Sequence, residues 1–260
     1  MNYGFYMSTA GLLTGSHAMD VASNNLANVE TPGFKVDVSM VRSRDAARVE
    51  DGLSHLPSNL MLERLGGGVT PWPARIDFKE GSLDMTSNPL DAAIRGEGFF
   101  VVRDGSAPAG DRERLTRDGR FLVDGSGRLV THDHGRPVLD TNNQPIHVPE
   151  GAKPSINASG EVVIDDEVIA QLNISTVADV RGLIKDGDGL FRSSGPIAGL
   201  LTPVETPRLQ PGAIERSGAD PIKAMTDVRA ANSMASRNAR MIDIHNDAMQ
   251  MAIARLGRVG

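Results

Sequence analysis

Two histidines flank an aspartate in the segment His132, Asp133 and His134. Side chains two residues apart on a strand point to the same face, and a pair of imidazoles on one face is a common part of a metal site. Such a site needs at least a third protein ligand, and the spacing of the nearby residues supplies none. We therefore interpret this segment as a solvated turn, with metal binding as the weaker alternative.

A second group of metal-ligand types is the aspartate pair Asp186 and Asp188 in the glycine-rich segment 185–189. Alternating acidic residues are typical of calcium loops, which also need an acidic residue at their far end. Residues 191–194 contain no Asp or Glu, so a glycine-rich turn is the better interpretation. The carboxylate run at 165–167 is of the kind that usually lies in solvent at a strand end.

The other glycine-rich segments lack the residues that nucleotide or acyl-transfer chemistry requires. The glycines at 66–68 are not followed by the Lys-Ser/Thr of a P-loop, and the segment 96–98 is too short for a dinucleotide fingerprint. No serine occupies a G-x-S-x-G elbow. The sequence therefore predicts no catalytic, cofactor-binding or metal-binding residues and no cofactor, and we do not expect an enzyme.

Composition narrows the class of protein further. The 260 residues suffice for one large domain or two smaller ones. Aromatic residues make up only 4% of the chain, which is low for a catalytic or carbohydrate-binding domain. The net charge of -6 argues against a nucleic-acid footprint, and the absence of cysteine excludes disulfides and thiolate sites.

Neither a membrane span nor a secretory signal is expected. No apolar run approaches the roughly 20 residues that a spanning helix needs. The first basic residue is Lys35, and residues 7–19 contain Ser, Thr, Gly and His where a signal would have an apolar core. If the protein leaves the cytoplasm, we expect a route without a cleaved signal.

The elements that would position any site are dominated by the C-terminal stretch, residues 221–256. Its seam residues alternate in steps of three and four, which is the 3.5-residue period of a coiled coil. Ser217 or Asp220 can cap this helix, with Pro221 in its first turn. A helix of about 50–55 Å needs a partner along its length. The seam comprises Met225, Val228, Asn232, Ala235, Ala239, Ile242, Asn246, Met249, Ile253 and Leu256.

Residues 6–29 repeat this spacing, so we expect the two terminal helices to pair. Leu13, Val21 and Ala27 lie off the seam, and apolar surface left uncovered in this way indicates a contact with another chain. Ordinary amphipathic helices of one globular core are the alternative. The N-terminal seam comprises Leu12, Gly15, Met19, Ala22, Leu26 and Val29.

Asparagines crowd the last two turns of this first helix, at Asn24, Asn25 and Asn28. Asparagine is a mediocre helix former, so the cluster lowers the local helix propensity. We expect these side chains to hydrogen-bond backbone groups, although a frayed polar helix end explains them equally well.

The middle of the chain has a different character. Residues 36–79 lack a sustained period, and we expect a long, partly extended connector with one helical turn near 60–65. From 81 to about 208, short apolar runs alternate with turn sequences, as in an antiparallel sandwich or barrel. Asp118-Gly119 predicts a hairpin, and residues 170–175 alternate like a strand with one buried face.

These patterns predict an α+β fold, in which terminal helices pair as a coiled-coil-like stalk beside a central, mainly antiparallel β domain of sandwich or barrel type. The expected boundaries are 1–35 for the N-terminal helix, 36–79 for the connector or arm, 80–208 for the β domain, 209–218 for a second connector and 219–260 for the C-terminal helix.

Three blocks of sequence resemble one known family. The run ASNNLANV at 22–29, followed by TPGFK at 31–35, resembles the opening motif of the flagellar basal-body rod and hook proteins. The run NPLDAAIRGEGFF at 88–100 resembles the motif that opens their β domain, and LTRDGRF at 115–121 continues it. The C-terminal helix matches in place and type. Chain length and the segments 81–91, 188–192 and 224–227 favour the proximal-rod type, with the distal-rod type second.

The resemblance implies a structural subunit that is exported unfolded by the flagellar type III apparatus and polymerises into the torque-transmitting rod across the periplasm. The implied partners are copies of itself, other proximal and distal rod subunits, the export apparatus and, as a further candidate, the surrounding ring bushing. Nucleic acid and small-molecule substrates are not expected. The predicted assembly interface comprises Leu12, Met19, Ala22, Asn24, Asn25, Leu26, Asn28, Val29, Met225, Val228, Ala235, Ala239, Ile242, Met249, Ile253 and Leu256.

A protein of another class is the alternative: a periplasmic or surface β domain that binds or cleaves glycans, with the helices as an oligomerisation stalk. Such a domain should carry an acidic pair in a cleft lined with aromatic side chains. One Trp and two Tyr in the whole chain argue against it.

Overall fold

The structure is a computed structural model that describes residues 3–45, 49, 52, 55, 57, 66–108, 111–193 and 197–256. The chain forms two compact units. We call Met1–Ala27, Asp37–Arg75 and Asp220–Gly260 the helical unit, and Asn28–Val36 with Ile76–Ala219 the β unit. The chain therefore crosses between the units four times.

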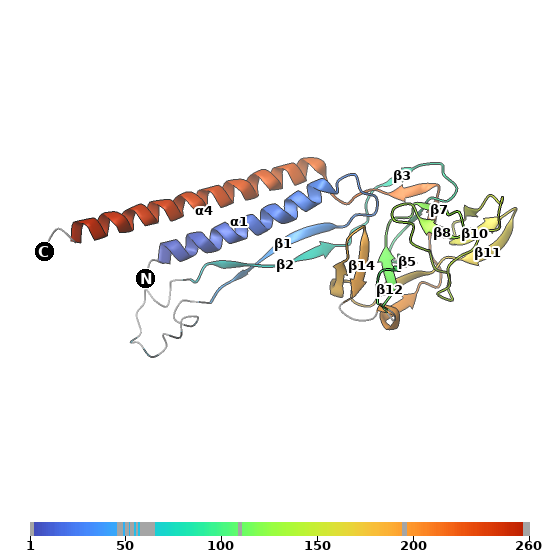
Figure 1. The fold of residues 1–260 in the computed structure, drawn as a ribbon, viewed down its shortest axis with the longest axis horizontal. Coiled ribbons are helices and arrows are strands. Elements are labelled where there is room, and N and C mark those ends of the chain that lie inside the picture. Colours follow the sequence, from blue (N-terminus) through green and yellow to red (C-terminus); the bar gives the residue numbers. More distant parts are fainter. Residues whose placement is uncertain are drawn as a thin grey trace. The chain divides into compact units, whose positions relative to one another are not determined.

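The elements lie along the chain as drawn in Figure 1. In order they are α1 (Tyr3–Ala27), β1 (Val36–Ser43), β2 (Val69–Asp77), β3 (Leu83–Met85), β4 (Ala92–Ile94), β5 (Phe99–Arg103), β6 (Glu113–Thr116), β7 (Phe121–Val123), β8 (Leu129–Thr131), β9 (Ser155–Ile156), β10 (Glu161–Ile164), β11 (Glu167–Gln171), β12 (Ile174–Val177), η2 (Val180–Gly182), β13 (Leu183–Lys185), β14 (Leu190–Ser193), η3 (Ile197–Leu200), β15 (Leu201–Pro203), β16 (Leu209–Pro211), β17 (Ala213–Glu215) and α4 (Pro221–Leu256). Terminal helices with a mostly antiparallel β region between them confirm the α+β class, whereas a sandwich or barrel stays a prediction.

Helix α4 begins where the sequence predicts. The backbone N–H of Lys223 donates to the side chain of Asp220 at 2.9 Å, so Asp220 is the N-cap. Pro221 occupies the first helical position, where its missing N–H has no cost. At 1.5 Å per residue, the 36 residues span about 54 Å. Neither described helix is both long enough and apolar enough to cross a membrane.

Helices α1 and α4 lie side by side and run in opposite directions (Figure 1). Small residues of α1 set their spacing. A Cβ added at Gly11 would come within 2.5 Å of the Asn238 side chain, and one at Gly15 would come within 2.9 Å of the Ala235 backbone. Glycine therefore allows the two backbones to approach closely, as small residues do at tight helix crossings.

The stripe of α4 that faces α1 keeps the expected alternating steps of three and four. Every second residue of the predicted seam, beginning with Met225, is replaced in this stripe by the residue before it. Ala224 and Ala231 are buried, whereas Met225 is 52% exposed. Alanine fits against the glycine-rich face of α1, and methionine does not. The stripe that faces α1 comprises Ala224, Val228, Ala231, Ala235, Asn238, Ile242 and His245.

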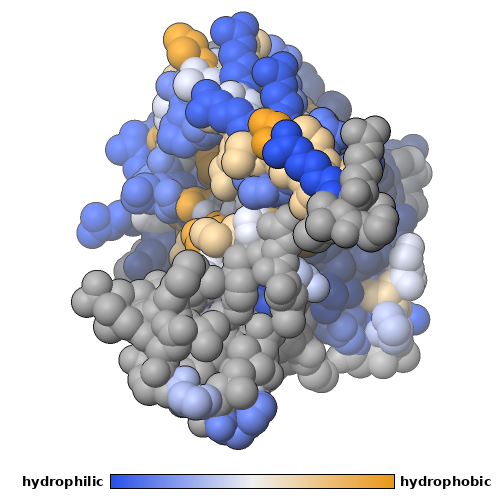
Figure 2. Space-filling view, turned by 90° about the vertical axis from the view of Figure 1, so that its left-hand side faces the viewer, coloured by the Kyte–Doolittle hydropathy of each residue, from blue (hydrophilic) through white to orange (hydrophobic). Residues whose placement is uncertain are grey.

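The C-terminal part of the expected seam extends beyond α1, its partner among the described residues. Gly4, near the start of α1, lies against His245 of α4. Later residues of α4 therefore continue past the start of α1, and Met249 and Ile253 are 41% and 70% exposed. The side chain of Leu256 lies outside the described side chains. Figure 2 looks onto this end of the molecule and shows hydrophobic surface among hydrophilic side chains.

The expected connector at 36–79 contains two strands. β1 and β2 form a two-stranded sheet. Pro71 and Pro73 lie within β2, where each removes one hydrogen-bond donor, and proline is tolerated in this way at a sheet edge. None of the residues of either strand is buried, and half-buried and exposed positions do not alternate regularly. The sequence therefore lacks the period-two pattern that would have predicted these strands. The helical turn expected near 60–65 lies outside the described residues.

The largest sheet of the β unit has six strands in the order β13-β14-β6-β5-β12-β15, and all of its pairs are antiparallel. Strand β5 lies in its middle. Phe99 and Val101 enter one hydrophobic cluster, and Phe100 and Val102 enter another. Because both faces of β5 are covered, its sequence is a continuous apolar run.

Two predicted strand patterns in the β unit are wrong. The segments on either side of Asp118-Gly119 do not pair, because β6 pairs with β5 and β14, and β7 pairs with β8. Gly119 instead accepts a hydrogen bond from the Ala92 N–H at 3.0 Å. A side chain at Gly119 would collide with the Ala92 carbonyl, so this turn serves close packing.

The second error concerns residues 170–175, which divide between β11 and β12 and are not one strand. Leu172 and Asn173 lie between the two strands, and both are buried. Asn173 belongs to the face that the alternation predicts to be in solvent. Its side chain is instead hydrogen-bonded inside the protein, where it donates to Asn143 at 2.8 Å and accepts from Ser175 at 2.6 Å.

The second connector, expected at 209–218, also contributes strands to the β unit. β16 pairs with β4, and β17 pairs with β3. This stretch follows Pro207 and contains Pro211 and Gly212, which masked its short strands in the sequence.

We expect Gly15→Val to loosen the pairing of α1 with α4. Valine is a better helix former than glycine, so any loss must come from its collision with the Ala235 backbone. An overpacked contact of this kind costs about 1–3 kcal/mol. Circular dichroism at the helix band should show a lower melting temperature.

Ser23→Val, at an exposed position of the same helix, is the matched control and should melt like the wild type. Equal melting temperatures for Gly15→Val and Ser23→Val would contradict the close approach of the two helices.

Candidate functional site

Three charged side chains are buried together in the β unit: Lys35, Arg117 and Glu215, whose side chains are 0%, 5% and 1% exposed. The Lys35 Nζ lies 2.5 Å from one Glu215 oxygen, and the Arg117 guanidinium lies 3.4 Å from the other. Buried charges are tolerated only when they are paired and hydrogen-bonded. We call these three residues the ion cluster.

Backbone groups complete the hydrogen bonds of the ion cluster. Lys35 also donates to the Lys79 carbonyl at 2.8 Å, and Glu215 accepts from the Gly81 N–H at 2.7 Å. Arg117 donates to the Gly96 carbonyl at 2.7 Å, and its guanidinium lies over the Phe99 ring. Its Nε is buried and has no hydrogen-bond partner among the described residues.

Desolvation acts on the two cations of the cluster. Burial lowers the pKa of Lys35, although the charge and hydrogen bond of Glu215 act in the opposite direction. Burial likewise lowers the pKa of Arg117, again against the effect of Glu215. The carboxylate of Glu215 is therefore the main group that opposes the desolvation of both cations in this interior.

The ion cluster lies close in sequence to the points where the chain passes between the two units. Lys35 is within two residues of the crossing after residue 36. Lys79 is within about four residues of the crossing after residue 75, and Glu215 is within about four residues of the crossing after residue 219. In addition, the Gly33 N–H donates to the Glu215 carbonyl at 2.8 Å, which joins the loop after α1 to the strand before α4. The cluster thus fixes, within the β unit, the ends of the segments that leave it.

The TPGFK motif at 31–35 has a direct structural explanation in this cluster. Gly33 has φ +69°, and a Cβ there would come within 2.6 Å of the Arg117 backbone. Only glycine fits both restrictions. The last two residues of the motif are also held: the Lys185 ammonium lies 3.8 Å from the centroid of the Phe34 ring, and Lys35 enters the cluster.

The asparagines at the end of α1 bind β1 of the helical unit. Asn25 is buried; its amide donates to the Asp37 carbonyl at 2.8 Å, and its oxygen accepts from the Asp37 N–H at 2.9 Å. The side chain thus pairs with the β1 backbone as a neighbouring strand would. Exposed Asn24 donates to the Asp37 carboxylate at 3.0 Å. Asn28 accepts from the Thr31 hydroxyl at 3.2 Å, within the loop of the β unit.

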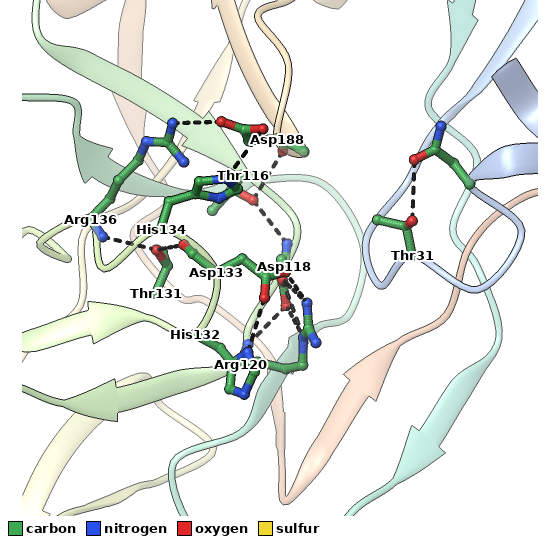
Figure 3. A network of polar contacts seen from close by, with 12 residues as sticks. Thr31, Thr116, Asp118, Arg120, Thr131, His132, Asp133, His134, Arg136 and Asp188 are labelled. Atoms are coloured by element: carbon green, nitrogen blue, oxygen red, sulfur yellow. Dashed lines mark hydrogen bonds and ion pairs between the residues drawn. The ribbon is translucent and has the colours of Figure 1, made fainter. Parts of the chain in front are cut away.

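The structure brings together the histidine and aspartate motifs that the sequence presented as separate features (Figure 3). His134 lies 3.5 Å from Asp188, and the same carboxylate accepts from Arg136 at 2.8 Å. His132 instead contacts Asp133, which also pairs with Arg120. The two histidines therefore contact different carboxylates and do not converge on one site.

Arginines also pair with Asp186, the other carboxylate of the glycine-rich segment 185–189. Asp186 accepts from Arg114 at 2.6 Å and from Arg192 at 2.8 Å. In the described part of the chain, no three His, Cys, Asp or Glu side chains are grouped so that they could hold a metal ion. The contacts that are present are those of an arginine–carboxylate network that cross-links turns.

Two carboxylates of this network have lowered pKa values. The hydrogen bond from His132 lowers the pKa of Asp133, with a further contribution from Arg120. The hydrogen bond from Arg136 lowers the pKa of Asp188, and His134 adds to the effect. Both carboxylates therefore favour the charged form that holds the turns together.

The residues expected at the assembly interface lie in several environments. Ala22 and Asn25 are buried, and Leu12, Met19, Leu26, Asn28 and Val29 are half-buried. The sequence did not identify Glu215 at all, because its partners are 180 and 98 residues away. The available signal was indirect: among apolar and turn residues, the TPGFK motif carries the single basic residue Lys35, and the LTRDGRF motif carries Arg117 together with Arg120.

Comparisons with known proteins agree with these features. Residues 5–35 match the family model described as flagella basal body rod protein, and residues 93–164 match that of the flagellar hook protein FlgE/F/G D1 domain. The first segment contains most of α1 together with the TPGFK motif, and the second contains the central part of the β unit. The chain belongs to the family of flagellar basal-body rod proteins, and it is a structural subunit of the rod.

Among individual relatives, the chain is 30% identical to the flagellar basal-body rod protein FlgF of Caulobacter vibrioides over 262 aligned residues, which cover 100% of both chains. It is 32% identical to FlgF of Escherichia coli, over 89% of each chain. Similarity extends to FlgG of Bacillus subtilis at 30% identity, over 94% of this chain and 96% of that protein.

We expect Asn25→Ala to free β1 from α1, because it removes both hydrogen bonds to the Asp37 backbone and leaves those groups unpaired. The cost should be about 1–3 kcal/mol. Hydrogen-exchange mass spectrometry should show faster exchange in β1.

The neighbouring substitution Asn24→Ala removes one exposed contact and should leave β1 exchange nearly unchanged. If both variants exchange alike, the paired contact of Asn25 is not what holds β1.

The network in Figure 3 should also shape the acid sensitivity of the β unit. A carboxylate with a lowered folded pKa stabilises the fold above its unfolded pKa of about 4, and this stability is lost as pH falls. Asp188→Asn cannot titrate, so it should reduce the loss of thermal stability between about pH 5 and pH 2.

Asp165→Asn, at the exposed turn between β10 and β11, is the control and should keep the wild-type acid response. An unchanged pH dependence in Asp188→Asn would show that this carboxylate does not contribute.

Proposed function

We propose that this subunit polymerises through its terminal helices, which pack against those of neighbouring rod subunits to build the torque-transmitting drive shaft. The observation that carries the proposal is the surface of α1. Among its 25 residues, Asp20 is the only acidic or basic residue apart from His17. Yet Tyr6, Met7 and Leu13 are 55%, 47% and 56% exposed. Depletion of charge on an apolar surface is typical of the core of an interface.

Helix α4 supports the same proposal. Apolar side chains remain exposed outside the stripe that faces α1, and Met249 and Ile253 continue that stripe beyond α1. Helices of neighbouring subunits would cover both regions. A heterologous contact that does not close on itself generates a filament, which is the geometry of a rod. In this proposal the coiled-coil-like seam is completed between subunits, at the interface residues predicted from the sequence.

The proximal rod is the favoured position within the shaft, with the distal rod second. FlgF proteins of several bacteria align along most of this chain, and FlgG proteins align at similar identity. The segments 81–91, 188–192 and 224–227, which resemble the proximal type, favour FlgF-like placement. Export by the flagellar type III apparatus, a position across the periplasm and contact with the ring bushing belong to the same proposal.

The role is mechanical and does not involve catalysis. A pocket of about 490 Å³ in the β unit does contain two carboxylates, Glu161 and Glu205, as the glycan hypothesis would require. The residues that line it include no aromatic side chain on which a sugar ring could stack. Binding of purified protein to a glycan array would revive that hypothesis.

We expect Leu13→Glu to block incorporation into the rod while the isolated subunit stays folded. Leu13 is 56% exposed, so a charge there costs the monomer little but would be buried in an interface. A strain that lacks the wild-type gene should not swim when it carries this variant, and isolated basal bodies should lack the subunit.

Ile184→Glu is the control, because Ile184 is 43% exposed on β13 of the β unit. It should support swimming. Normal swimming with Leu13→Glu would contradict the proposed helical interface.

A further inference from the structure

The ion cluster connects residues that no local element can bring together. Lys35 and Glu215 are 180 residues apart in the chain, and Arg117 and Glu215 are 98 residues apart. Their backbone partners Lys79 and Gly81 come from a further segment. The cluster therefore exists only when all of these segments are already in place.

Burial of any one of the three charged side chains costs free energy until its partners are in place. Lys35 and Glu215 are almost fully removed from solvent, and a buried charge without a partner is strongly destabilising. Even in the complete cluster the pKa of Lys35 is lowered, with desolvation by burial as the largest cause and the attraction of Glu215 acting against it. A partly assembled cluster would carry the desolvation without the compensation.

Neighbouring parts of the β unit have no such restriction. In the hairpin of β5 and β6, Arg103 pairs with Glu113, and Phe100 pairs with Thr116. Contacts over so few residues form early, because little chain entropy is lost when their loop closes. The β unit can thus acquire its central strands while the charges of the cluster are still hydrated.

We infer that the ion cluster closes last when the β unit folds, and that it acts as a kinetic lock that slows unfolding without speeding folding. An interaction that is absent from the folding transition state changes the unfolding rate almost alone. Unfolding under force is governed by that rate. A lock of this kind suits a rod subunit, which must stay folded under load.

The test compares folding and unfolding rates of full-length variants after jumps in denaturant concentration. Pulse-labelling hydrogen exchange with mass spectrometry reads the β5 and β6 peptides, which report on the β unit. Glu215→Gln keeps the shape and removes the charge, whereas Lys35→Met keeps the chain length and leaves Glu215 paired with Arg117. We expect both to unfold at least tenfold faster and to fold within twofold of the wild type.

Arg181→Gln is the control, because its ion pair with Asp179 is exposed and local. Both of its rates should stay within twofold of the wild type. A folding rate that falls as much as the unfolding rate rises would place the cluster in the transition state and overturn the inference. Unchanged unfolding rates would overturn it as well. If Glu215→Gln does not fold, Lys35→Met decides between these outcomes.

Discussion

The structure depends on one carboxylate, that of Glu215, which neutralises two buried cations at once. Replacing only one partner of a buried pair leaves an uncompensated charge, which typically costs about 3–5 kcal/mol. Glu215 also joins segments from both ends of the chain, through Lys35 and through the Gly33 backbone. The segments by which the chain enters and leaves the β unit are therefore held by electrostatic contacts and hydrogen bonds inside that unit.

The helical unit follows a different physical rule. Glycines and alanines let α1 and α4 approach closely, and this leaves the larger apolar side chains on outward faces. Such a pair has its smallest side chains inside and most of its methionines and isoleucines outside, which is the reverse of a self-sufficient two-helix core. Methionine is flexible and polarisable, so it can adapt to partners of different shape. A subunit with several kinds of neighbour benefits from that property.

The sequence predicts what local spacing determines. The helices, the Asp220 cap and the buried run in β5 all follow from periods and turn chemistry within a few residues. It does not predict contacts that depend on distant segments. The turn at Asp118-Gly119 has the chemistry of a hairpin, yet the chain changes sheet there because Gly119 packs on Ala92. The buried ion pairs of Glu215 could not be predicted either, because a single acidic residue in a proline-rich stretch gives no information about its partners.

The central claim is that the outward apolar faces of α1 and α4 are covered only in the assembled rod. Hydroxyl-radical footprinting of the free subunit and of isolated basal bodies tests this claim directly. Oxidation of Tyr6, Leu13, Met225 and Met249 should fall strongly on assembly, whereas oxidation of Ile184 in the β unit should stay near its level in the free subunit. Equal oxidation of the helical side chains in both states would contradict the account.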